Sequence, residues 1–216
     1  MRMTAPRVRV LLVDDHAVVR AGYRLLLQTA PEIEVVAEAD SGELACRLFA
    51  ELAPDVVVMD LALPGIGGLE AIRRIVQRDP KARVLVFSMH EDTMFVEHAL
   101  AAGASGYVTK SSAPQVLVAA VKQVAAGGRP FAADIAQRLA FDRVRGRDTP
   151  LMELSTREFE IFCLLAEGLT SADIAKRLSL SHKTVANYGT QLKSKLQVGS
   201  VAELTRLAIR HGIIAA

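Results

Sequence analysis

The chain has 216 residues, 51% of them hydrophobic, and a formal net charge of +2. This length allows one large hydrophobic core or two smaller ones, and ordinary domain sizes favour two. The nearly neutral charge gives no whole-chain argument for nucleic-acid binding, and Cys46 and Cys163 are too few for a disulfide framework or a zinc site. We expect a cytoplasmic protein, because no stretch looks like a secretory signal or reaches the roughly 20 apolar residues of a membrane span.

From residue 8 to about residue 126, short β-branched runs alternate with longer segments of helical period, which is typical of βαβ units. Strands are expected over 8–13, 34–39, 55–59, 83–87 and 105–108. The run "VVVM" has no polar alternation, which indicates burial on both faces. We therefore predict an α/β fold, a doubly wound five-stranded parallel sheet in the flavodoxin-like order 2-1-3-4-5 with helices on both faces.

The pattern changes after Ala126. "GGRP" interrupts the last helix, residues 131–141 read as one short amphipathic helix, and "DRVRGRDTP" is polar and ends at Pro150. We interpret this stretch as a linker. The expected division of the chain is a sheet domain at 1–127, the linker at 128–150 and a third region at 151–216.

The third region carries the capping residues that mark the starts of short helices. "STRE" at 155–158 has the form of a capping box, which predicts a helix that begins at this point. Further helices are expected from about Ser171, after Ser181 and from about Ser200 to His211. The chain therefore ends in a small all-α domain.

Three carboxylates follow strands that should be neighbours. Asp14 and Asp15 end the first strand and Asp60 ends the third, and in this strand order ligands bind beside these carboxyl ends. Mutual repulsion disfavours three ionised groups, whereas Mg²⁺ prefers carboxylates, a carbonyl and waters as ligands. An acid pair alone at a strand end more often caps a helix, but the third acid favours a metal site.

Two further residues should lie at the same edge of the sheet. Ser88 ends the fourth strand and Lys110 ends the fifth. If Asp60 accepts a phosphoryl group, Lys110 and the metal would stabilise its oxygens, and the Ser88 hydroxyl would donate a hydrogen bond to one of them.

These motifs resemble those of the response regulators of two-component signalling. The matching stretches are "VDDH" at 13–16, "MDLALPGIGGLEA" at 59–71, "FSMH" at 87–90 and "GASGYVTKSS" at 103–112. The resemblance implies that a sensor histidine kinase phosphorylates Asp60. It also implies a Mg²⁺ site at Asp14, Asp15, Asp60 and the backbone carbonyl of Ala62, a switch pair of Ser88 and Tyr107, and Lys110 as charge partner.

Two departures from that family's pattern stand out. Gly67 occupies a position where the family often carries Asp, and with Gly68 after it we expect a looser loop. Ser111 rather than Pro follows Lys110.

The third region carries an uneven charge and a helix-turn-helix pattern. All charged residues between Asp173 and Glu203 are basic, namely Lys176, Arg177, Lys183, Lys193 and Lys195. In "TSADIAKRLSLSHKTVANYGTQLKSKL" two helices flank a short turn, the form whose second helix enters the major groove of DNA. The residues expected to pack the two helices together are Ile174, Leu178, Val185 and Leu192.

The same pattern leaves Lys183, Asn187, Thr190 and Lys193 facing outward. Asn can read adenine, whereas Lys and Thr suit phosphates. Residues 154–214 resemble the LuxR-type DNA-binding domain, and with the first domain this is the NarL/FixJ architecture, closest in appearance to the GacA/UvrY branch. The resemblance implies contact with double-stranded DNA through Lys183, Thr184, Asn187, Tyr188, Thr190, Lys193 and Lys195.

Some positions depart from that resemblance. Ala186, Tyr188 and Val201 replace residues that are common in the family, so base preference does not carry over. Gly189 within the second helix costs about 1 kcal/mol against Ala, and only a close approach to another group would account for it.

The chain is therefore expected to be a phosphorylation-dependent transcription factor rather than an enzyme. It should act as a homodimer when phosphorylated or on DNA. Leu204, Leu207 and Ile209 of the last helix are either a dimer face or core. One alternative keeps the DNA binding but makes the first domain a phosphorylation-independent dimerisation module.

Two other classes fit less well. A phosphatase of the haloacid dehalogenase kind would want an acid where Ala62 stands. A flavin-binding module would need a phosphate-cradling loop after the first strand, where "DDH" repels anions.

Overall fold

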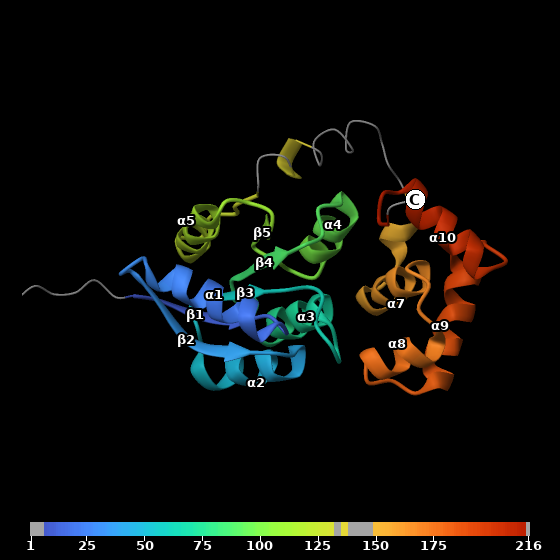
Figure 1. Ribbon diagram of the computed structural model, residues 1–216, viewed down its shortest axis with the longest axis horizontal. Coiled ribbons are helices and arrows are strands. Elements are labelled where there is room, and N and C mark those ends of the chain that lie inside the picture. The colour runs from blue at the N-terminus through green and yellow to red at the C-terminus, as the bar shows by residue number, and fades with distance from the viewer. Residues whose placement is uncertain (1–6, 132–134, 138–148, 215–216) are drawn as a thin grey trace, which may run out of the picture.

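The computed structural model describes residues 7–131, 135–137 and 149–214. Figure 1 shows a sheet flanked by helices and, beside it, a separate group of helices. We call residues 7–131 the sheet domain and residues 149–214 the helical domain.

The sheet has the predicted topology. Its strands are β1 (Val8–Val13), β2 (Ile33–Ala39), β3 (Val56–Met59), β4 (Val84–Ser88) and β5 (Gly106–Thr109). All pairings are parallel, and the order is β2-β1-β3-β4-β5. Each observed strand end lies within one residue of its predicted position, because β-branched runs bounded by polar residues mark strands clearly.

The five helices of the sheet domain cover both faces of the sheet. They are α1 (Ala17–Gln28), α2 (Gly42–Leu52), α3 (Gly68–Arg78), α4 (Thr93–Ala101) and α5 (Pro114–Ala125). Leu12 faces a cluster with Leu27 of α1 and Val121 of α5, whereas its neighbour Leu11 faces α2, α3 and α4. Since successive strand residues point to opposite faces, an unbroken apolar strand fills both layers.

The helical domain has η1 (Pro150–Glu153), α7 (Thr156–Ala166), α8 (Ser171–Arg177), α9 (His182–Lys195) and α10 (Val201–Arg210). The predicted capping box is present at Ser155 and Glu158. The short 3-10 helix η1 was not predicted. Most of the helix predicted over 131–141 lies outside the described residues, although 135–137 are helical.

The helix-turn-helix pair packs as predicted. Ile174, Leu178, Val185 and Leu192 are each at most 4% exposed. In α10, Leu204 is fully buried, while Ile209 is 37% exposed. None of the helices in the described part of the chain is long and apolar enough to span a bilayer.

The two domains contact each other through an apolar and aromatic interface. The rings of Phe95 in α4 and Phe159 in α7 meet edge to face at 5.1 Å. The His98 ring stacks on Phe159 at 3.8 Å, and its Nε2 lies 3.1 Å from the carbonyl oxygen of Leu151 in η1. One apolar cluster consequently continues from the sheet domain into the helical domain.

Candidate functional site

The site is at the carboxyl edge of the sheet, where β1 and β3 end side by side. Val13 and Met59 are paired in the ladder, so Asp14 and Asp60 leave their strands at the same level. The Asp60 N–H donates to the Val13 carbonyl at 3.0 Å. Asp14 is 2% exposed and Asp60 3% exposed, so both carboxylates depend on partners within the protein.

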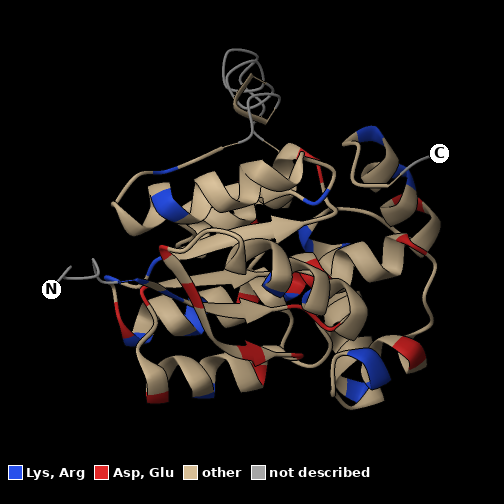
Figure 2. Ribbon diagram, turned by 60° about the vertical axis from the view of Figure 1, so that its left-hand side comes forward, with Lys and Arg blue, Asp and Glu red and all other residues tan. Residues whose placement is uncertain are grey.

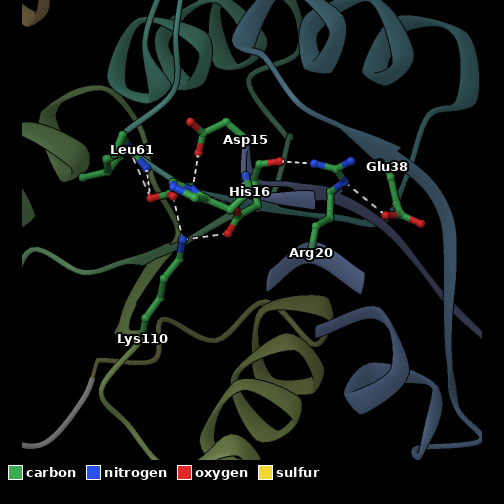
Figure 3. A network of polar contacts seen from close by, with 9 residues as sticks. Asp15, His16, Arg20, Glu38, Leu61 and Lys110 are labelled. Carbon is green, nitrogen blue, oxygen red and sulfur yellow. Dashed lines mark hydrogen bonds and ion pairs between the residues drawn. The ribbon is translucent and has the colours of Figure 1, made fainter. Parts of the chain in front are cut away.

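Lys110, just after β5, is the partner that the two carboxylates share. Its Nζ lies 2.7 Å from Oδ2 of Asp14 and 2.6 Å from Oδ2 of Asp60, and Figure 3 shows the ammonium group between the two oxygens. Burial lowers the pKa of Lys110, but the hydrogen bonds to the two carboxylates outweigh it, so the net direction is upward. The amine therefore stays cationic.

Asp15 and His16 form the more open side of the site. The Nδ1 atom of His16 lies 2.7 Å from Oδ1 of Asp15, and Figure 3 shows the two side chains turned toward each other. Ligand atoms of Asp14, Asp15 and His16 all lie within 4.8 Å of one another. Asp60 is not in that group and meets Asp14 through Lys110.

The other oxygen of Asp60 is held by the backbone that follows it. Oδ1 accepts from the N–H of Leu61 at 2.7 Å and of Ala62 at 3.3 Å. These contacts fix the direction of the carboxylate. The sequence assigned the Ala62 carbonyl to a metal, and that role stays a prediction.

The glycine pair at the start of α3 lies against close neighbours, and the looser loop expected from it stays a prediction. A Cβ on Gly68 would collide with the carbonyl oxygen of Asp60, and the Gly68 N–H donates to Leu61 at 3.1 Å. Gly67 has φ of 75°, and a Cβ there would collide with the Glu160 carboxylate of the helical domain. Both glycines are required by close contacts.

Ser88 and Tyr107 both contact the loop between β4 and α4. The Ser88 side chain is fully buried, and its Oγ accepts from the His90 N–H at 3.3 Å. The Tyr107 hydroxyl donates to the His90 carbonyl at 2.8 Å. Burial raises the pKa of Tyr107 despite a hydrogen bond with Ser88, so the phenol stays protonated. His90 therefore connects the two residues.

Arg20 also belongs to this edge, and the sequence did not indicate it. Its Nη1 donates to the Asp14 carbonyl at 2.5 Å, and its Nε lies 3.1 Å from Glu38, as Figure 3 shows. The contact positions the backbone of the acidic pair. No motif marks it, because the two partners of Arg20 are a backbone atom and a residue on β2.

The residues proposed to contact DNA all belong to α9. Lys183, Asn187, Thr190 and Lys195 are exposed, while Thr184, Tyr188 and Lys193 are half-buried. Figure 1 shows α9 on the side of the helical domain away from the sheet, and Figure 2 shows basic segments on the helices of this domain.

Three residues of α9 have surroundings that the sequence did not predict. Lys195 pairs with Glu158 of α7 at 3.0 Å, and Tyr188 packs partly on the apolar core. Gly189 makes no close approach to another group of this chain, since a Cβ there would meet only Leu165 among the described residues, at 4.0 Å. That explanation of Gly189 is therefore wrong for the protein alone.

Comparison with known proteins identifies relatives over nearly the full length of the chain. Residues 10–122 match the response regulator receiver domain, and residues 152–208 match the bacterial regulatory proteins of the luxR family. The response regulator UvrY of Escherichia coli (strain K12) is 41% identical over 208 residues, covering 95% of each chain. The response regulator GacA of Pseudomonas aeruginosa is 40% identical over 209 residues, covering 96% of this chain and 98% of its own.

A solved structure extends the similarity to three dimensions. RcsB from Salmonella enterica serovar Typhimurium, bound to a promoter in the presence of a phosphomimetic, is 27% identical with a TM-score of 0.68. The match covers 93% of this chain and 97% of that one.

Proposed function

This chain belongs to the two-component response regulators that carry a LuxR-type DNA-binding domain, and from that premise we propose that phosphorylation of Asp60 controls its binding to double-stranded DNA. The observation that carries the proposal is the shared contact of Lys110 with two buried carboxylates. We divide the chain accordingly into a receiver at 1–127, a linker at 128–150 and a DNA-binding domain at 151–216.

In the proposed reaction, Asp60 is the phosphoryl acceptor. A carboxylate oxygen attacks the phosphorus of a phosphohistidine on a sensor kinase, the P–N bond breaks, and an acyl phosphate forms. Lys110 lies where it can donate to the transferred group, and the buried Ser88 hydroxyl can donate once its contact with His90 rearranges. The chain accepts a phosphoryl group rather than turning over a substrate, so we propose a regulator and not an enzyme.

The donor set fits a magnesium ion. Asp14, Asp15 and Asp60 bring more negative charge than Lys110 balances, and Mg²⁺ favours hard oxygen ligands. We propose that these carboxylates and the Ala62 carbonyl hold Mg²⁺. When bound, the ion would neutralise charge on the phosphoryl oxygens.

Ser88 and Tyr107 would transmit the change to α4. Both side chains contact His90, which precedes α4, and α4 packs against η1 and, through Phe95 and His98, against Phe159 of α7. A rearrangement of Ser88 toward a phosphoryl group would therefore alter the surface on which the DNA-binding domain rests. This relation supports Ser88 and Tyr107 as the switch pair.

On DNA, α9 would be the recognition helix, with Lys183, Asn187 and Thr190 at its exposed surface. RcsB is described as bound to a promoter, which supports the same class of partner here. We propose that the protein binds DNA as a homodimer and regulates transcription. We further propose that it acts in the cytoplasm, where both DNA and the kinase are accessible.

The test is the intact mass of the full chain after incubation with acetyl phosphate and Mg²⁺. We expect one phosphoryl adduct in the wild type and in Asp40→Asn, and none in Asp60→Asn. Asp40 is the matched control because it is an exposed carboxylate at the end of β2, on the same edge of the sheet. An adduct that persists in Asp60→Asn, or that forms equally well without magnesium, would refute the assignment.

A further inference from the structure

Helix α3 begins without a cap of its own. Its N-cap residue is Gly67, which has no side chain to accept a hydrogen bond from the first turn. N-cap side chains usually satisfy the amide of the second or third helical residue. Helix α3 begins directly after the loop that follows Asp60, so whatever caps the first turn of α3 also holds that loop.

A carboxylate from the other domain lies at this position. The Glu160 carboxylate, on α7, occupies the space that a Cβ of Gly67 would need. Only 11% of the Glu160 side chain is exposed. Burial raises the pKa of this carboxyl group, and the backbone N–H of Glu70, the third residue of α3, is near enough to oppose that shift. The carboxyl oxygen Oε2 pairs with Arg157, whereas Oε1 has no hydrogen-bond partner among the described residues. An N-cap side chain would serve the same amide.

Neighbouring contacts fasten the same loop to the helical domain. Arg157 Nη1 lies 2.9 Å from Glu160 Oε2 and donates to the carbonyls of Gly65 and Ile66 at 3.2 and 3.3 Å. The Gly65 N–H in turn donates to the Arg177 carbonyl at 2.9 Å. Backbone of the β3–α3 loop is thus bonded to both α7 and the end of α8.

We propose that Glu160 caps helix α3 across the domain interface, in the space left by the missing side chain of Gly67, and so latches the DNA-binding domain onto the loop that follows Asp60. The latch goes beyond the proposed function and does not depend on phosphorylation. A side chain at position 67 would displace Glu160 and separate the domains. An Asp there would add repulsion between two carboxylates.

The latch includes an exchangeable proton. Burial raises the pKa of Glu160 to about 7, although Arg157 opposes the shift. The Oε1 atom is buried and accepts no well-formed hydrogen bond from the described residues, which fits a carboxyl group that is partly protonated. The charged and titratable groups around it are Arg157 and Cys163 of α7, Glu167 just after α7, Glu70 of α3, Arg177 of α8 and His90 before α4.

Cys163 provides a native probe of the latch. It is 5% exposed and lines a small cavity of about 60 Å³ between the domains, beside Gly67 and Glu160. Separation of the domains would expose its thiol. The experiment measures the rate at which N-ethylmaleimide alkylates Cys163 in the full chain, at constant pH and without phosphodonor, with Cys46→Ser removing the other thiol.

We expect Gly67→Asp, Gly67→Ala and Glu160→Ala each to raise the alkylation rate by at least about tenfold, which corresponds to about 1.4 kcal/mol of lost docking. Glu160→Gln keeps the shape and an acceptor oxygen and should stay near the wild-type rate. The control is Gly127→Ala, where φ is 85° but nothing lies within 4 Å of the new Cβ. It should also leave the rate unchanged.

A double-mutant cycle separates the latch from backbone strain. With Glu160→Ala present, Gly67→Ala should add much less than it does alone, because the collision partner is gone. Wild-type rates in both Gly67→Asp and Glu160→Ala would overturn the proposal, as would a Gly127→Ala rate as high as that of Gly67→Ala. Urea unfolding of each variant verifies that alkylation reports domain separation.

Discussion

The ammonium nitrogen of Lys110 lies 2.6 Å from Oδ2 of Asp60, although 50 residues separate the two along the chain. The Lys110 side chain is 7% exposed and that of Asp60 4% exposed. Because the ion pair is buried, removal of one partner leaves charge in a poorly solvated place. The contact therefore affects stability as well as phosphoryl chemistry.

Lys110→Ala should destabilise the sheet domain by about 3 kcal/mol without metal, since Asp14 and Asp60 both lose their cation. Millimolar Mg²⁺ should recover part of this loss, because a divalent cation can replace the ammonium group. The measurement is urea unfolding with and without Mg²⁺. Lys81→Ala, at an exposed position before β4, should change stability by less than about 0.5 kcal/mol. An equal loss in Lys110→Ala at every magnesium concentration would contradict the shared role.

Lys183→Ala should weaken binding to duplex DNA and lower the slope of log affinity against log salt concentration by about 1, as expected for one lost phosphate contact. Lys183 is exposed near the start of α9. Titrations at several salt concentrations give the slope. Lys81→Ala again serves as the matched lysine, now in the other domain, and an identical slope in both variants would argue against α9 as the contact surface.

Gly189→Ala should stabilise the helical domain by up to about 1 kcal/mol, because alanine favours the helix and the new methyl group meets only Leu165, at ordinary van der Waals distance. Thermal unfolding of the full chain would show a rise in the midpoint. The opposite change is expected for Gly168→Ala, where φ is 88°. If Gly189→Ala is more stable but binds DNA more weakly, the glycine is required for contact with DNA and not for the stability of the fold.

Docking of the domains should depend on pH through two groups that act in opposite directions. Burial lowers the pKa of His98 to about 4 from 6.5, so docking releases a proton and weakens as the pH falls from 6.5 toward 4. Burial raises the pKa of Glu160 to about 7 from 4.5, so docking takes up a proton and strengthens as the pH falls from 7 to 4.5. Each effect amounts to at most about 3 kcal/mol.

Single variants should separate these two effects. Glu160→Gln leaves His98 alone, so its radius of gyration by small-angle X-ray scattering should increase on acidification below pH 6.5. His98→Asn leaves Glu160 alone, so the variant should become more compact as the pH falls below 7. The wild type should change less than either, and parallel curves for the two variants would show that the two groups do not oppose each other.

The fold could be predicted closely because its signals are local. Unbroken β-branched runs mark β1, β3 and β4, and Ser155, Thr170, Ser181 and Ser200 cap the four α-helices of the helical domain where the sequence placed helix starts. The meeting of Asp14, Asp60 and Lys110 also follows from sequence, since parallel strands bring their carboxyl ends to one edge.

The domain interface could not be predicted in this way. Arg157 and Glu160 are charged residues on a helix, and such residues ordinarily face solvent. Their partners are backbone atoms of the β3–α3 loop and the empty position at Gly67. Backbone acceptors leave no pattern in the sequence, and the linker composition predicts no orientation of one domain against the other. Gly67 in place of the family's Asp was the single visible sign.

The cap on α3 has a consequence for how such proteins diversify. Gly67 and Glu160 belong to different domains, so neither domain carries the complete contact when it recombines with a foreign partner. A hybrid regulator that joins this sheet domain to an unrelated DNA-binding domain would keep the space beside Gly67 but would lack the carboxylate that fills it. A substitution at either position alone would weaken the docking of the two domains. Restoring the docking would require a compensating substitution in the other domain.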